Sequence, residues 1–244
     1  DDTAPYSDGD VNPDMTQALA DAFLLDGTDN DVYDWVAGVY GEEWGAEAGA
    51  YSNTVPETDT ITILLYAIPT QGVTGPGGIV GFFWAKDNYL RSEIDYSNER
   101  VMFYIDSATF AAGDGGWDIT DDNPSDIVST LGHELQHMID FHQIFVLNEV
   151  STQTWLNETK SLVAEDLIEE KRRQRGPRGI APPDPYDETA WGTAGTVGIS
   201  AGRLPLYNLK NDISLTAWGS TSDVLESYAI AYAFGAYLAR NFGG

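Results

Sequence analysis

The stretch His133-Glu134-Leu135-Gln136-His137 is the part of this sequence that best indicates its fold. On a helix, the first and fifth positions lie on one face, so both imidazoles can bind one metal ion. Glu134 lies about 100° around the helix from His133, within reach of a metal-bound water, where its carboxylate can act as a general base. The alternative is a helix with two surface histidines and a solvated glutamate. The chain has only 3 histidines, and two of them fall in this stretch, which favours the metal site.

The residues around this stretch predict a helix that carries it. Asn123 can cap the helix, Pro124 suits the first helical position, and Asp126 favours its positive end. An apolar stripe follows at helical spacing, formed by Ile127, Leu131, Leu135, Met138 and Phe145. We therefore expect one face of this helix to be buried.

A zinc site needs a third protein ligand, and histidine does not supply it here. A histidine six residues after His137 would suit, but that position is Gln143. His142 is one residue short and lies about 140° around the helix from His137. We therefore expect His142 to be an ordinary packed or surface residue.

Three glutamates are the remaining candidates for the third ligand. Glu158 follows His137 by 158 − 137 = 21 positions and lies near the start of a predicted helix. Glu165 is seven residues further on the same face, as a rival ligand or as a partner behind the ligand. Glu149 is a weaker candidate in the connecting segment. A solvated helix face is the usual environment of such residues.

The order of elements predicts an α+β fold. Helical spacing comes first, then three β-branched and aromatic runs, and then helices again. The predicted helices cover residues 15–25, 32–40, 154–173 and 223–241, the strands cover 60–68, 79–84 and 101–105, and residues 176–221 are predicted as long loops. We expect one catalytic domain with two lobes. Residues 1–143 form a sheet-and-helix lobe that ends in the motif helix, and residues 144–244 form a mainly helical lobe with the third ligand.

Composition excludes several classes of function. The chain has 244 residues, 12 basic and 39 acidic, so its net charge is −27. A surface this negative repels phosphate backbones and anionic lipid headgroups, so we expect neither nucleic-acid nor membrane binding. The longest apolar stretch, residues 228–239, is too short to span a membrane. Cysteine is absent, which excludes cysteine-ligated metals and thiol catalysis.

Two further features lead to weaker expectations. Asp26, Asp29, Asp31 and Asp34 could hold a structural calcium ion, although they lack the EF-hand spacing and a solvated loop is the alternative. The sequence begins at Asp1 with neither methionine nor signal peptide, so we expect a trimmed piece of a longer precursor. We also expect a monomer.

The motif, followed by Trp155-Leu156-Asn157-Glu158, resembles the gluzincin metallopeptidases, the thermolysin and aminopeptidase N class. Three other stretches, at residues 101–106, 162–166 and 228–238, are similar to the hyicolysin family of secreted bacterial peptidases. The resemblance covers about residues 101–244. One position departs from it, because Thr159 follows Glu158 where such sequences usually carry glycine.

The resemblance implies a zincin-like fold with the active-site cleft between the lobes. It implies a secreted endopeptidase that acts on proteins or peptides, with Zn²⁺ bound by His133, His137 and Glu158 and with Glu134 as the general base. It also places Tyr228 where gluzincins often carry a tyrosine that stabilises the oxyanion. A buried aromatic stripe with Tyr232, one turn later, is the alternative.

Three points stay open at this level. A zinc aminopeptidase is one competing function, and a non-catalytic, calcium-stabilised binding module with a vestigial zinc helix is another. We also expect residues 101–105 to form an edge strand that pairs with an extended substrate peptide.

Overall fold

The computed structural model describes residues 11–25, 27, 31–48, 51, 53–69, 78–113, 116–172, 174, 203–219 and 224–243. The chain divides into two compact units, Asp1–Ser151 and Thr152–Gly244. The predicted boundary after residue 143 falls inside the helical segment Phe141–Val146, which belongs to the first unit. The first unit contains both a sheet and helices, and the described part of the second unit is helical, so the α+β prediction is confirmed.

The sheet of the first unit has three strands in the order β1-β3-β2. They are β1 (Thr62–Tyr66), β2 (Gly81–Phe83) and β3 (Met102–Asp106), and each overlaps a predicted strand. β1 is parallel to β3, whereas β2 is antiparallel to it. The expectation that residues 101–105 form an edge strand is wrong. β3 is central because its run of apolar residues is buried on both faces, while β1 and β2 are only half-buried.

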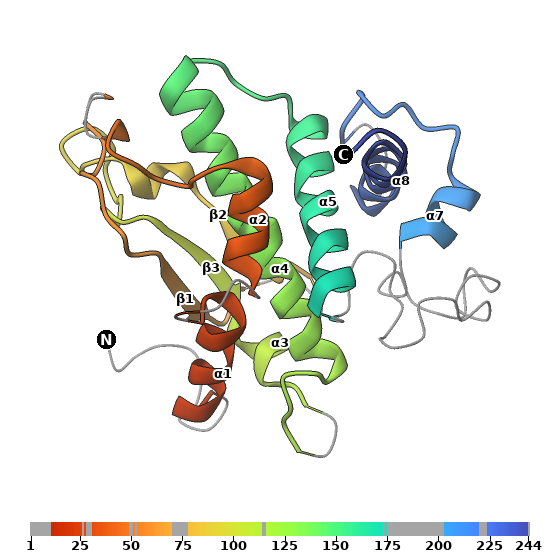
Figure 1. Ribbon diagram of the computed structural model, residues 1–244, viewed down its shortest axis with the longest axis horizontal. Coiled ribbons are helices and arrows are strands. Elements are labelled where there is room, and N and C mark those ends of the chain that lie inside the picture. The colour runs from red at the N-terminus through yellow and green to blue at the C-terminus, as the bar shows by residue number, and fades with distance from the viewer. Residues whose placement is uncertain are drawn as a thin grey trace. The chain divides into compact units, whose positions relative to one another are not determined.

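In the part of the first unit that the structure describes, four α-helices accompany the sheet (Figure 1). They are α1 (Pro13–Phe23), α2 (Val32–Tyr40), α3 (Ser107–Ala111) and α4 (Asp122–Asp140), and α4 packs against β2, β3, α2 and α3. The predicted apolar stripe of α4 is buried, with Ile127, Leu131, Leu135 and Met138 fully inaccessible. The π-helical turn Phe141–Val146 continues α4, and Phe141 and Phe145 stack with ring centres 5.4 Å apart.

The start of α4 differs from the prediction by two residues. Asp121, not Asn123, is the N-cap, so Pro124 lies at the third helical position. Proline is tolerated there because the first turn has no intrahelical partner for its missing N–H. The Asn123 side chain instead donates to the Ala112 carbonyl at 3.1 Å, which ties the helix start to the segment after α3.

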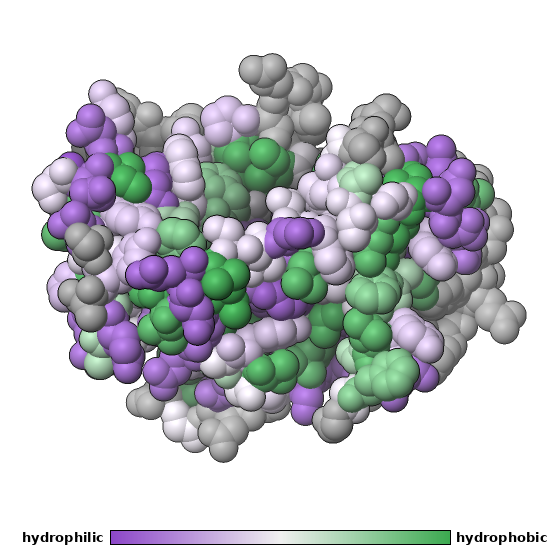
Figure 2. All heavy atoms as spheres, turned by 90° about the horizontal axis from the view of Figure 1, so that it is seen from above, coloured by the Kyte–Doolittle hydropathy of each residue, from purple (hydrophilic) through white to green (hydrophobic). Residues whose placement is uncertain are grey.

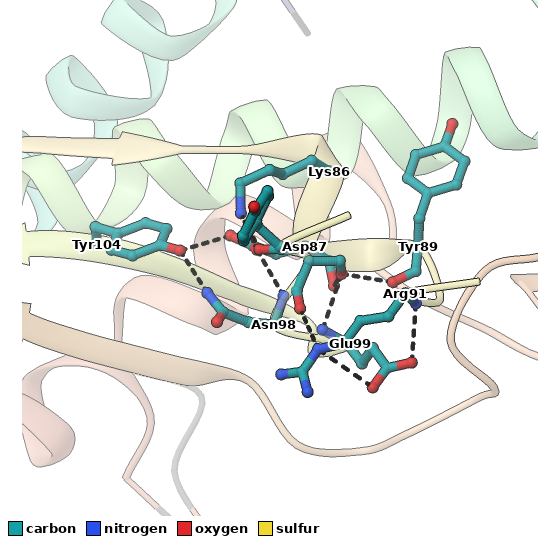
Figure 3. Close-up of polar contacts among 9 residues, drawn as sticks. Lys86, Asp87, Tyr89, Arg91, Asn98, Glu99 and Tyr104 are labelled. Carbon is teal, nitrogen blue, oxygen red and sulfur yellow. Dashed lines mark hydrogen bonds and ion pairs between the residues drawn. The ribbon is translucent and has the colours of Figure 1, made fainter. Parts of the chain in front are cut away.

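A buried polar network holds the segment between β2 and β3, which includes the 3₁₀ turn Ala85–Asn88 (Figure 3). Asp87 is fully buried and accepts from the Tyr104 hydroxyl at 2.6 Å and from the Asn98 backbone N–H at 2.9 Å. The Lys86 ammonium lies 2.8 Å from the same carboxylate. Burial, followed by the contact with Asp87, raises the pKa of Tyr104 well above its usual value. The buried charge is therefore paired and hydrogen-bonded, as its burial requires.

The described part of the second unit contains α5 (Thr154–Arg172), α7 (Arg203–Leu209) and α8 (Val224–Phe242), with α8 packed against both others. α5 and α8 match the predicted helices to within a residue or so at each end. The prediction of long loops over residues 176–221 is wrong at α7. α7 has 7 residues, and its apolar pattern is too short to stand out among glycine- and proline-rich neighbours, although Leu204 packs against the core.

The core of the second unit joins α5 to α8 through Leu162, Ala231, Tyr232 and Ala236. The Tyr232 hydroxyl donates to Asp166 Oδ1 at 2.9 Å, and Arg240 lies 2.6 Å from Asp166 Oδ2. This buried tyrosine and carboxylate fix the register of the two helices.

None of the described helices is both long and apolar enough to span a bilayer. Figure 2 shows hydrophilic side chains scattered over the visible face, with apolar patches between them.

Candidate metal centre

α4 places His133 and His137 one turn apart on the same side of the helix. Their ring centres are 4.7 Å apart, with the ring planes at 80° to each other. His133 is buried and His137 is half-buried. The first unit therefore brings together two imidazoles that can direct one nitrogen each at a common point, as the i, i+4 spacing predicts.

Glu134 follows His133 on the buried side of α4 and is only 4% exposed. Burying a carboxylate costs free energy, so a glutamate without a role belongs on the solvent face of such a helix. His133 is likewise only 8% exposed. These two values exclude the alternative of surface histidines beside a solvated glutamate.

Glu158 belongs to the second unit, in the first turns of α5, where its side chain is half-buried. It offers a carboxylate oxygen as a ligand atom. The next residue, Thr159, is buried, and its hydroxyl donates to the Trp155 carbonyl at 2.6 Å. A Cβ on Gly235 of α8 would lie 2.8 Å from the Thr159 methyl carbon. Gly235 thus leaves room for Thr159, the residue that stands where similar sequences usually carry glycine.

The other ligand candidates have different surroundings. Glu165 lies two turns beyond Glu158 on α5 and is half-buried. Glu149 is exposed and ends the helical segment after α4 with a left-handed backbone, at φ 55°. His142 is a packed residue, as predicted, because its Nδ1 lies 3.0 Å from the Glu42 carbonyl oxygen and its ring packs on Trp44.

Tyr228 and Tyr232 differ in their surroundings, although both lie on α8. Tyr232 is a core residue, since it is 1% exposed and its hydroxyl binds Asp166. Tyr228 is half-buried, with its ring edge-on to Trp218 at 4.9 Å and the Arg203 guanidinium 5.0 Å from the ring centre. Sequence reasoning missed Arg203, because it lies in a stretch predicted to be loop and no motif marks it.

The acidic cluster proposed for calcium is only partly described, because Asp26 and Asp29 lie outside the described residues. Asp31 is fully buried and caps α2, accepting from the Asp34 N–H at 3.0 Å and from the Leu25 N–H at 2.9 Å. Both oxygens of the Asp31 carboxylate thus accept from backbone N–H groups. Its role as a helix cap accounts for its burial without calcium.

Comparison with known proteins adds the family. A profile of the peptidase M30 family matches residues 2–174. The chain belongs to the peptidase M30 family. The M30 match includes His133, Glu134, His137 and Glu158 but ends before Tyr228.

This M30 chain is also similar to the neutral metalloprotease ShpI of Staphylococcus hyicus, with 27% identity over 184 residues. The alignment covers 73% of the chain and 34% of the relative, so the chain spans about a third of that protein. The resemblance to the hyicolysin family is confirmed. No solved structure matches significantly.

Proposed function

We propose that this chain is a secreted zinc endopeptidase in which His133, His137 and Glu158 bind Zn²⁺ and Glu134 is the general base. The observation that carries the proposal is the pair of imidazoles on α4, with ring centres 4.7 Å apart and the buried Glu134 beside them. Membership of a peptidase family gives this arrangement its chemical context.

The donor set fits zinc. His133 and His137 each offer a ring nitrogen, and Glu158 offers a carboxylate oxygen. Imidazole and carboxylate suit Zn²⁺, and three protein ligands leave a fourth position for water or substrate, as in catalytic sites. When bound, the ion would make that water more acidic and polarise the peptide carbonyl.

The chain's own residues would do the remaining chemistry. The Glu134 carboxylate takes the proton of the attacking water and then delivers it to the leaving amine nitrogen. The Tyr228 hydroxyl donates a hydrogen bond to the oxyanion, where it acts mainly in the transition state. Glu165 supports the ligand set from behind. The zincin-like arrangement of two lobes around a cleft is part of this proposal, as is action by the monomer.

The test is hydrolysis of an internally quenched peptide blocked at both ends, with zinc content measured in parallel. We expect cleavage that a chelator abolishes and added zinc restores. Cleavage only of peptides with a free amino terminus would show an aminopeptidase instead. Zinc binding without cleavage of either peptide or of casein would show a binding module.

A further inference from the structure

A groove of about 900 Å³ lies in the first unit between α1 and β1. One wall comes from α1 and the segment after it, with Leu19, Phe23 and Leu24, and the other from Ile63 and Leu65 of β1. Leu24 is 49% exposed, and Ile63 and Leu65 are only half-buried. No residue of α4 lines the groove, so it is separate from the histidine pair.

One part of the groove lining is acidic. It carries five carboxylates, those of Glu42, Glu43, Glu47, Glu57 and Asp59, and no lysine, arginine or histidine. None of the five forms an ion pair with any residue that the structure describes. An occupant with positive charge would therefore relieve repulsion among these side chains, and a negatively charged one would be rejected.

The free edge of β1 runs along the same groove. β3 is the one neighbour of β1 within the described sheet. The Thr62 N–H donates to the Val101 carbonyl at 2.9 Å, toward β3. Backbone groups alternate in direction along a strand, so those of Ile63 and Leu65 point away from β3. Among the described residues, this edge offers unpaired donors and acceptors beside two apolar side chains that already line the groove.

An unsatisfied buried nitrogen lies behind the acidic part. His142 is 2% exposed, and its Nε2 has no hydrogen-bond partner among the described residues. A Cβ on Gly45, which lines the groove, would lie 3.5 Å from His142 Cε1, 3.4 Å from Glu47 Oε2 and 3.6 Å from Glu42 Oε2. The side chains of Glu42, Glu47 and His142 thus meet around one point of the groove wall.

We infer that this groove binds a basic, extended peptide segment, which adds a strand to the free edge of β1 and places lysine or arginine side chains among the carboxylates. Strand addition supplies backbone hydrogen bonds, and the groove selects the alternate side chains. A bare metal ion fits less well, because the carboxylates of the groove do not converge into a candidate metal group within the described chain. The binding does not depend on the proposed peptidase function.

The test is fluorescence anisotropy with three labelled eight-residue peptides and the full chain. The first alternates lysine and leucine, the second alternates glutamate and leucine, and the third is the first with every other backbone nitrogen methylated. The Glu134→Gln chain is used so that the probe stays intact, which mass spectrometry verifies. We expect the first peptide to bind in a salt-dependent way and the other two to bind at least about tenfold more weakly.

Variants distinguish the groove from general attraction to an acidic protein. Glu42→Gln with Glu47→Gln should weaken binding of the lysine–leucine peptide about tenfold, since two carboxylate contacts are lost. Asp95→Asn with Glu170→Gln removes the same charge from exposed positions outside the groove and should leave binding unchanged. Leu24→Ser should weaken binding through the apolar wall. Equal loss in both charge variants, or equal binding of the methylated peptide, would overturn the inference.

Discussion

Gly81 of β2 and Thr130 of α4 are so closely packed that a Cβ on Gly81 would lie 2.7 Å from the Thr130 methyl carbon. The same Cβ would lie 3.0 Å from the Tyr104 carbonyl oxygen, which is backbone and cannot rotate away. The Thr130 hydroxyl donates to the Asp126 carbonyl at 2.8 Å, which favours keeping its methyl group in place. Since Thr130 lies one turn before His133, this contact fixes α4 against the sheet near the histidine pair.

Gly81→Ala should therefore destabilise the protein by about 1–3 kcal/mol, because overpacking forces the strand or helix to shift. Denaturant unfolding measures this loss. Thr130→Ser in the same chain removes the clashing methyl group and should restore part of the stability. If the double variant is no more stable than Gly81→Ala, the contact is not the cause.

Gly38→Ala is the matched control for this substitution. Gly38 lies on the exposed side of α2, and a Cβ there would meet nothing within 4 Å. Alanine should stabilise the helix by about 0.5–1 kcal/mol, so the two glycine substitutions are expected to have opposite signs.

Glu43 gives a prediction about pH. Burial raises the pKa of this carboxyl above its usual value, although the hydrogen bond from Tyr33 at 2.9 Å opposes the shift. A raised pKa in the folded state means that stability is full below the unfolded pKa, near 4.5, and is lost as the pH rises through the folded pKa. Glu43→Gln keeps an acceptor for Tyr33 and removes this loss.

The Tm of Glu43→Gln should therefore exceed that of the wild type at pH 7, and the difference should shrink toward pH 4. Thermal unfolding followed by circular dichroism at several pH values measures this. The solvent-exposed Glu57→Gln is the control and should change Tm little. A wild type that is more stable than Glu43→Gln at pH 7 would contradict the prediction.

The third ligand can be tested by removing each glutamate in turn. Glu158→Ala should lose both zinc and activity, because it removes a ligand of the ion. Glu165→Ala should weaken zinc binding only about 10–100-fold, as changes behind a ligand do. Zinc titration and elemental analysis give both values. If Glu165→Ala loses the metal and Glu158→Ala keeps it, the third ligand is Glu165, two turns later on α5, and not Glu158.

Tyr228→Phe tests the role of its hydroxyl. We expect kcat to fall roughly 10²-fold, with KM little altered and zinc retained, since the bond to the oxyanion acts mainly in the transition state. Tyr232→Phe is the control on the same helix. It should cost about 1.5–3 kcal/mol of stability through its bond to Asp166, without changing kcat. A Tyr228→Phe enzyme with wild-type kcat would remove Tyr228 from the site.

Local patterns predicted the long helices well and tertiary relationships poorly. The helices around His133, Glu158 and Tyr232 follow from apolar spacing, which is read within one element. The central place of β3 does not, because its apolar run is consistent with burial on both faces but does not specify which strands pair with it. The two-residue shift at the start of α4 could not be predicted locally either, because the Asn123 side chain bonds the Ala112 carbonyl and does not cap the helix.

The proposed site and the groove also combine features that one element determines with features that depend on tertiary structure. The spacing of His133, Glu134 and His137 is a property of one helix, so the sequence predicts their common face. Choosing Glu158 over Glu149 and Glu165 required a family resemblance, because the proposed third ligand lies on another element. The groove combines residues 16–65 from two helices, a strand and two loops, and no local motif marks it.

The zinc content and the turnover of the Glu134→Gln variant together test most directly whether Glu134 is the general base of a zinc site. If Glu134 activates water without binding the ion, the variant keeps about one zinc per chain and loses at least about 100-fold in kcat on the blocked peptide. Near-wild-type hydrolysis would contradict its role as the base. Loss of the zinc together with the activity would contradict the ligand set of His133, His137 and Glu158.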